Sequence, residues 1–121
     1  ATGAAIGADR ARRVISLQAD GSAMYSLQSL WTQARERLPV TTILLANGKY
    51  NILIGEYRAV GAAPGATAMS MLDLGDPSLD WVRIANGMGV EGARATTLEQ
   101  CADLMTSSFG RAGPFVIELC V

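Results

Sequence analysis

The chain has 121 residues, a length typical of one domain with a real hydrophobic core. Half of the residues are hydrophobic and only 17% are charged, which excludes an intrinsically disordered chain. The net charge is −1 and the arginines are scattered, so we expect no nucleic-acid partner. The absence of His excludes a histidine-based triad or a histidine metal site.

The sequence also bears on location. No apolar stretch approaches the roughly 18 to 20 residues that span a bilayer, so we expect no membrane partner. The opening Ala/Gly-rich residues 1–7 lack the basic leader of a signal peptide and do not begin with Met. We therefore expect a fragment of a larger multidomain chain. Cys101 and Cys120 do not have metal-ligand spacing and fit reduced thiols of a cytoplasmic protein.

Strands and helices alternate along the first half of the chain. Residues 13–19 form a short apolar run typical of a strand. Residues 22–37 repeat apolar side chains at helical spacing, and Ser22 would be the N-cap of this helix. Val40–Ala46 is a continuous apolar run of the kind buried in parallel sheets. A shorter helix is predicted over residues 50–58.

The second half continues the alternation after an irregular stretch. Residues 60–75 contain Gly, Ala and Pro without a clear period, which predicts a loop or lid. Asp76 followed by Pro77 is typical of an N-cap and first helical position, and it predicts a helix to residue 86. The remaining predicted elements are a weak strand over 89–95, a helix with a capping box over 97–108 and a strand over 114–121.

This order of elements predicts the fold. Strands that alternate with helices form βαβ units, which build a parallel sheet with helices on both faces. We therefore expect one α/β domain over residues 1–121, with three α/β/α layers and a mostly parallel sheet.

Two polar side chains follow two neighbouring strands of this sheet. Asp20 follows the strand over 13–19, and Asn47 follows Val40–Ala46. Ligands of open parallel sheets bind beyond the carboxyl ends of the strands. Mg²⁺ takes about six oxygen ligands, usually only one or two of them protein carboxylates, and the others are water and phosphate. Asp20 and Asn47 therefore predict a magnesium site with room for a diphosphate.

The residues after Asp20 fit the phosphate part of such a site. Gly21 allows the backbone to come close, and the free amides of a helix starting at Ser22 suit phosphate oxygens. Spacing alone leaves an alternative open. Asp20 and Ser22 could simply cap a helix, and Asn47-Gly48 could be an ordinary turn.

The residues at and around these positions favour the magnesium and diphosphate site over a simple cap and turn. Asp20-Gly21-Ser22, with 24 residues between Gly21 and Ala46, resembles the thiamine-diphosphate motif that runs from Gly-Asp-Gly to Asn-Asn. Ala19 and Ala46 replace its first Gly and first Asn. Three further segments resemble acetolactate synthase large subunits and benzoylformate decarboxylase: Ser22–Thr32, Asp80–Val90 and Gly113–Glu118. The chain thus resembles the C-terminal thiamine-diphosphate-binding domain of this family over nearly its whole length.

The resemblance implies a role for each site residue. Asp20 and Asn47 would give side-chain oxygens to Mg²⁺, and Lys49 would give its backbone carbonyl. Residues expected to contact the diphosphate, or to lie near it, are Gly21, Ser22, Gly48 and Tyr50. Leu53 and Glu56 would border the substrate pocket, although a solvated helix face is an equally good interpretation of Glu56.

The resemblance also implies a function. The expected activity is thiamine-diphosphate- and Mg²⁺-dependent decarboxylation and carboligation of 2-oxo acids, as in acetolactate synthase. A benzoylformate-type decarboxylase is the alternative within this class, and a non-catalytic phosphate- or nucleotide-binding module is the alternative outside it. The activating Glu belongs to the pyrimidine-binding domain of a partner subunit in this family. We therefore expect a homodimer or homotetramer, no catalytic residue in this chain, and no activity from the chain alone.

Overall fold

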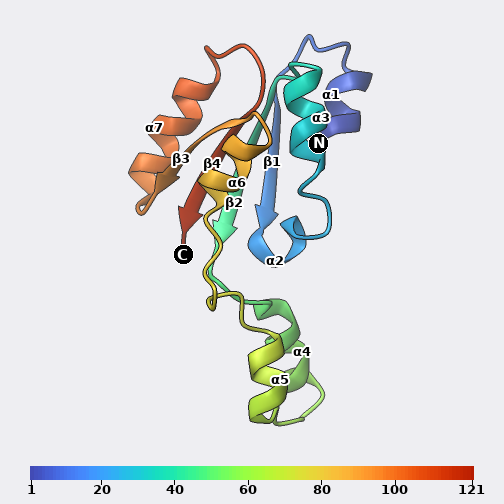
Figure 1. Ribbon diagram of the computed structural model, residues 1–121, viewed down its shortest axis with the longest axis vertical. Coiled ribbons are helices and arrows are strands. Elements are labelled where there is room, and N and C mark those ends of the chain that lie inside the picture. Colours follow the sequence, from blue (N-terminus) through green and yellow to red (C-terminus); the bar gives the residue numbers. More distant parts are fainter.

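The computed structural model describes residues 1–121 and has four strands and seven helices (Figure 1). The strands are β1 (Val14–Ala19), β2 (Val40–Ala46), β3 (Glu91–Ala95) and β4 (Phe115–Cys120). They form one sheet in the order β1-β2-β4-β3, in which all neighbouring strands are parallel. The predicted parallel sheet is therefore confirmed. The helices are α1 (Thr2–Gly7), α2 (Asp20–Ala23), α3 (Ser29–Arg35), α4 (Asn51–Ala59), α5 (Ala66–Met71), α6 (Trp81–Gly87) and α7 (Leu98–Ser108).

Helices cover both faces of the sheet, so the three-layer α/β/α fold is confirmed. On one face, Cys101 of α7 packs with Ile117 of β4 in the largest buried cluster. On the other face, Leu30 of α3 and Ala85 of α6 pack with Val116 of β4. Successive strand residues point to opposite faces, which is why neighbours on β4 belong to different clusters. The central strand β4 is buried on both faces, as expected for a strand of a parallel sheet.

The edge strand β1 is covered on one face only. Its burial alternates between half-buried and exposed residues, and Ile15 and Leu17 are on the exposed side. These residues share the face on which α7 packs, but α7 contacts β3 and β4. Leu45 of β2 is exposed on the same face. The sheet therefore presents an apolar strip along β1 that no helix of this chain covers.

The long helix predicted over residues 22–37 is wrong, because two short helices replace it. The chain leaves the α-helical pattern after Ala23, where Tyr25, Ser26 and Ser29 each donate to the carbonyl three residues earlier. Ser22 is not the N-cap. Ala19 occupies that position, and the Ser22 hydroxyl donates to the Ala19 carbonyl at 3.1 Å. Serine hydroxyls compete with backbone hydrogen bonding, which weakens a helix that contains several of them.

Two predictions in the second half also need correction. Residues 60–75 are not entirely a loop, since α5 forms within them. The helix predicted from Pro77 begins only at Trp81, and the Asp76–Pro77 peptide bond is cis and lies before it. Asp80 is the actual N-cap, because its carboxylate accepts a hydrogen bond from the Arg83 amide at 3.0 Å. The helix thus starts where the following side chain, Trp81, can be buried.

Helices α4 and α5 form an arm that projects from the carboxyl end of the sheet (Figure 1). The arm joins the sheet through two antiparallel segments, where Lys49 pairs with Asp73. The Leu74 amide donates to the Gly48 carbonyl at 2.7 Å, and the Tyr50 amide donates to the Leu72 carbonyl at 2.9 Å. The base of the arm is therefore part of the loop that follows β2.

Candidate functional site

The Asp20 carboxylate holds the ends of β1 and β2 together. Asp20 is the first residue of α2, directly after β1, and it is only 1% exposed. Its Oδ1 accepts from the Gly21 amide at 2.8 Å. Its Oδ2 accepts from the amides of Asn47 at 2.9 Å and Gly48 at 2.6 Å. The structure thus brings together the two strand ends that the sequence pattern paired.

The loop after β2 is a tight turn that exposes oxygen atoms. The Asn47 side-chain oxygen accepts from the Lys49 amide at 3.1 Å, and Gly48 has a φ of +66°. Residues that carry a side chain rarely adopt this backbone angle, which explains the Gly at this position. No hydrogen bond from the protein ends on the Lys49 carbonyl oxygen. We name residues 47–49 the cation loop.

The oxygen atoms around this loop fit a hard cation. Asp20 contributes a carboxylate, Asn47 an amide oxygen and Lys49 a free backbone carbonyl. Asp20 accepts three N–H bonds, and a carboxylate has about four lone-pair positions, so one remains for a metal. One carboxylate with neutral oxygens suits Mg²⁺, which completes its shell with water and phosphate. The donor set therefore fits the predicted cation.

Tyr50 covers the glycine of the turn. A Cβ atom added to Gly21 would lie 2.6 Å from Cδ1 and 2.9 Å from Cε1 of Tyr50, which is closer than atoms can approach. Any side chain at position 21 would therefore have to displace the Tyr50 ring. Ser22 is exposed, and its hydroxyl accepts a hydrogen bond from the side-chain nitrogen Nε2 of Gln18 at 3.2 Å. We name residues 20–23 the Asp20 turn. The four residues predicted for the diphosphate all lie in the Asp20 turn, in the cation loop or next to them.

The helix at this turn is shorter than expected, and Ala19 fits the turn without strain. The helix expected to present its N-terminus to phosphate is only four residues long, so individual amides would have to bind the phosphate in place of a long helix dipole. The methyl group of Ala19 does not crowd the turn, because Ala19 has a φ of −81° in the ordinary extended region.

Leu53 and Glu56 lie on the arm, away from the Asp20 turn. Both are exposed on α4, and they line a shallow apolar hollow with Tyr57, Val60 and Leu72. None of the residues around Asp20 lines this hollow. The hollow that Leu53 and Glu56 line is thus separate from the Asp20 carboxylate, although the Leu53 amide donates to the Tyr50 carbonyl at 3.0 Å.

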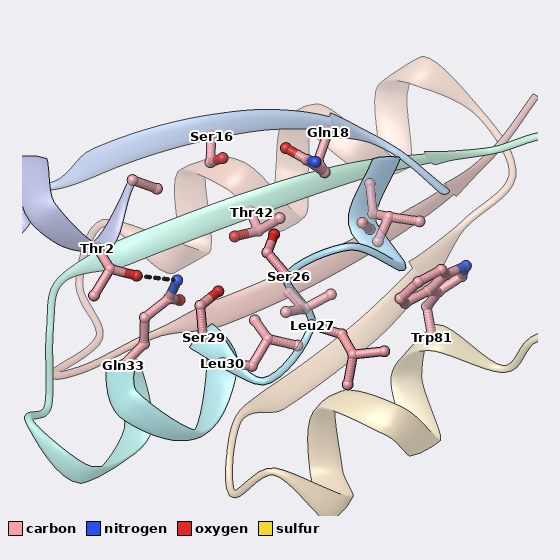
Figure 2. Close-up of a pocket in the computed structure, with 14 residues that line it drawn as sticks. Thr2, Ser16, Gln18, Ser26, Leu27, Ser29, Leu30, Gln33, Thr42 and Trp81 are labelled. Carbon is pink, nitrogen blue, oxygen red and sulfur yellow. Dashed lines mark hydrogen bonds between the residues drawn. The ribbon is translucent and has the colours of Figure 1, made fainter. Parts of the chain in front are cut away.

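A partly enclosed cavity lies behind the turn, between the sheet and α3 (Figure 2). Its volume is about 100 Å³, and polar side chains of β1 and β2 face it, among them Ser16, Gln18 and Thr42. Gln33 is 3% exposed and donates to the Thr2 hydroxyl at 3.1 Å, whereas its side-chain oxygen has no partner. Sequence reasoning missed this cavity, although polar residues on the covered face of β1 were a signal for it.

Sequence reasoning also missed a charged cluster at the carboxyl ends of β3 and β4. Glu118 is 3% exposed, and both its carboxylate oxygens accept from Arg94, at 3.2 and 3.1 Å. This hydrogen bond and the charge of Glu118 raise the pKa of the Arg94 guanidinium above its usual value. The signal was available, because Glu118 is the one charged residue in an otherwise apolar strand.

The fold and the site define a class of protein. Residues 1–119 match the family described as thiamine pyrophosphate enzyme, C-terminal TPP binding domain. The chain belongs to this family, which binds thiamine diphosphate. No helix in the structure combines the length and the apolar character needed to cross a bilayer.

Individual relatives agree with this assignment. IlvX of Mycobacterium tuberculosis, named as an acetolactate synthase large subunit, is 47% identical over 123 residues, covering 100% of this chain and 24% of its own length. Benzoylformate decarboxylase of Pseudomonas aeruginosa is 35% identical over 96% of this chain and 21% of its own length. A thiamine diphosphate-dependent 4-hydroxybenzoylformate decarboxylase from Rhodococcus jostii RHA1 superposes with a TM-score of 0.83 at 36% identity, over 98% of this chain and 21% of that chain.

The chain spans about a quarter or less of the length of these relatives. It is a C-terminal thiamine-diphosphate-binding domain, similar to the corresponding part of an acetolactate synthase large subunit and of benzoylformate decarboxylases. These homologues are thiamine-diphosphate-dependent enzymes, which confirms the predicted enzyme class.

Proposed function

We propose that this chain binds the diphosphate and Mg²⁺ of thiamine diphosphate for an enzyme that decarboxylates a 2-oxo acid and ligates the product. The supporting observation is the buried Asp20 carboxylate, which accepts amide hydrogen bonds from both strand ends beside a free Lys49 carbonyl. It occurs in a chain of the thiamine pyrophosphate family. As in acetolactate synthase, the bound cofactor would provide the electron sink for decarboxylation.

The proposed role of this chain is to bind the cofactor and to orient it. Mg²⁺ would take oxygens from Asp20, Asn47 and the Lys49 carbonyl, and it would neutralise part of the diphosphate charge. The amides that Asp20 already fixes would keep the cation loop in one conformation before the cofactor arrives. Residues proposed to contact the diphosphate or to lie beside it are Gly21, Ser22, Gly48 and Tyr50.

The chain contributes half of a site in this proposal. Residues 1–121 are one C-terminal diphosphate- and Mg²⁺-binding domain, and the pyrimidine-binding domain of a partner subunit completes the site. A cytoplasmic homodimer or homotetramer that acts on a 2-oxo acid is the corresponding assembly. Because no side chain of this domain is assigned to the reacting atoms, the domain alone is inactive.

A benzoylformate-type decarboxylase is the second candidate, favoured by the 35% identity to benzoylformate decarboxylase. Leu53 and Glu56 bear on this choice, since the charged Glu56 suits a small or polar acceptor better than an aromatic acid. Product analysis of the complete protein with pyruvate and with benzoylformate distinguishes carboligation from release of an aldehyde.

Calorimetric titration of the complete protein with thiamine diphosphate and Mg²⁺ tests the proposed binding. Asp20→Ala should abolish Mg²⁺-dependent binding, because the only carboxylate of the site is lost. Asp103→Ala is the matched control, since Asp103 is an exposed acid on α7, and it should bind as the parent protein does. Failure of the parent protein to bind thiamine diphosphate would refute the proposal. Binding of a nucleotide in its place would favour the non-catalytic alternative.

A further inference from the structure

A buried carboxylate connects α6 to the sheet. Glu118 of β4 is the register partner of Arg94 of β3, and the two side chains form an ion pair at 3.1 Å. The Val82 amide, in the first turn of α6, donates to Glu118 Oε2 at 3.3 Å. A buried charge is strongly destabilising unless it is paired and hydrogen-bonded, so Glu118 depends on Arg94 and the Val82 amide as partners.

The same cluster includes the N-cap of α6. Asp80 accepts from the Arg83 amide at 3.0 Å and lies 3.5 Å from the Arg94 guanidinium. Two amides of the first turn thus end on carboxylates, one from the helix and one from the sheet. The start of α6 is therefore fixed relative to β3 and β4 by charged side chains.

The start of α6 also packs against the Asp20 turn and against β2. Trp81 is 2% exposed and packs in one cluster with Leu44 and Ala23. Ala23 ends α2, and Leu44 lies on β2 shortly before the cation loop. Leu79, just before the helix, packs against the same cluster. A shift of α6 would therefore reach both sides of the candidate site.

The segment that leads into α6 holds the cation loop directly. Its Leu74 amide donates to the Gly48 carbonyl at 2.7 Å, and its Leu72 carbonyl accepts from the Tyr50 amide at 2.9 Å. These two bonds flank the Lys49 carbonyl, which is the backbone oxygen assigned to Mg²⁺. The position of that oxygen thus depends on residues 72–75, which pair with the loop after β2 and which the chain joins to α6 through residues 76–80.

We propose that Glu118 is a positioning residue for the cation loop, acting through α6 and residues 72–75 on the Lys49 carbonyl. The partners of Glu118 in the structure are Arg94 and the Val82 amide, so Glu118 would act on the cation only indirectly. The inference rests on the proposed function for the identity of the cation. The mechanical connection between Glu118 and the loop can be measured without any cofactor.

Glu118→Gln tests the connection, because it removes the ion pair but keeps the side-chain size and an acceptor for the Val82 amide. In the complete protein, the Mg²⁺ concentration for half-maximal thiamine-diphosphate binding should rise about tenfold. In the cofactor-free protein, hydrogen exchange at the Tyr50 and Leu74 amides should accelerate about tenfold. Glu91→Gln is the matched control, since Glu91 pairs with Arg111 at the opposite end of β3. It should change neither quantity.

A lower melting temperature with unchanged exchange at Tyr50 and Leu74 and an unchanged Mg²⁺ dependence would overturn the inference, because Glu118 would then be only structural. If Glu118→Gln does not fold, Glu118→Asp keeps the charge and withdraws the carboxylate from Val82, and accelerated exchange at the same two amides is again required. If the parent protein binds no thiamine diphosphate, the proposed function fails, whereas the exchange measurement still decides the role of Glu118.

Discussion

At the scale of single residues, the candidate site depends on three residues whose type the local geometry constrains. Asp20 accepts three amide hydrogen bonds while 1% exposed, and Gly21 lies under the Tyr50 ring. Gly48 adopts a φ of +66°. Each residue type here follows from a specific geometric demand, and this makes the turn sensitive to single methyl groups.

Gly21→Ala should destabilise the protein by about 1–3 kcal/mol, because the added methyl group displaces the Tyr50 ring. The Gly21→Ala/Tyr50→Ala double variant should be less destabilised than the sum of the single variants, since the clash disappears with the ring. Urea unfolding of the four proteins measures this coupling. Strict additivity would show that the ring does not restrict position 21.

The environment of Glu99 should make the stability of the fold depend on pH. Its own backbone amide, and secondarily the Thr97 side chain, lower the pKa of Glu99 below its usual value of 4.5. A lowered folded-state pKa stabilises the fold above the unfolded pKa, and this contribution is lost as pH falls through the folded value. Glu99→Gln should therefore flatten the loss of thermal stability below about pH 4.5. An unchanged acid profile of melting temperature would contradict this.

At the scale of elements, side chains at helix ends decide where the helices run. Asp80, not Asp76, caps α6, and Trp81 is then buried as the first helical residue. The Gln100 side chain accepts from the Thr96 amide at 2.9 Å, and Thr97 accepts from the Gln100 amide at 3.2 Å. This reciprocal pattern is close to the predicted capping box, and the helix over 98–108 is confirmed.

Two glycines at the end of α6 should respond in opposite directions to Ala. Gly89 has a φ of +80° and its added Cβ would lie 3.4 Å from Ala34 Cβ, so Gly89→Ala should destabilise the protein by about 1–2 kcal/mol. Gly87 is the last residue of the helix with open space around it, and Gly87→Ala should stabilise by about 0.5–1 kcal/mol. Chemical denaturation compares them. Equal effects would show that backbone conformation does not govern this helix end.

At the scale of the whole molecule, the domain presents surfaces that the chain does not cover. The apolar strip on β1 includes Leu17, which is 70% exposed, and Ile15, which is 41% exposed. The arm exposes Ile52 and Met71. Contiguous apolar surface of this kind is typical of interaction sites, and β1 is also an edge strand with unpaired backbone groups.

The isolated 121-residue chain should self-associate through this strip. Leu17→Lys should weaken the association about tenfold or more, because a charge in an apolar contact is costly to desolvate. Leu98→Lys is the control: Leu98 is 73% exposed but begins α7, away from β1. Sedimentation velocity over a concentration series measures both. A larger effect of Leu98→Lys than of Leu17→Lys would place the contact elsewhere.

The alternation of strands and helices, the parallel sheet and the meeting of the strand ends that carry Asp20 and Asn47 could be predicted from the sequence alone. These features follow from short-range patterns, since a buried parallel strand is apolar throughout and a strand end carries its polar residue with it. The projecting arm and the Glu118–Arg94 pair become evident only in the folded chain. Each depends on neighbours distant along the chain, 24 residues apart for Arg94 and Glu118, which only the register of the folded sheet brings into contact.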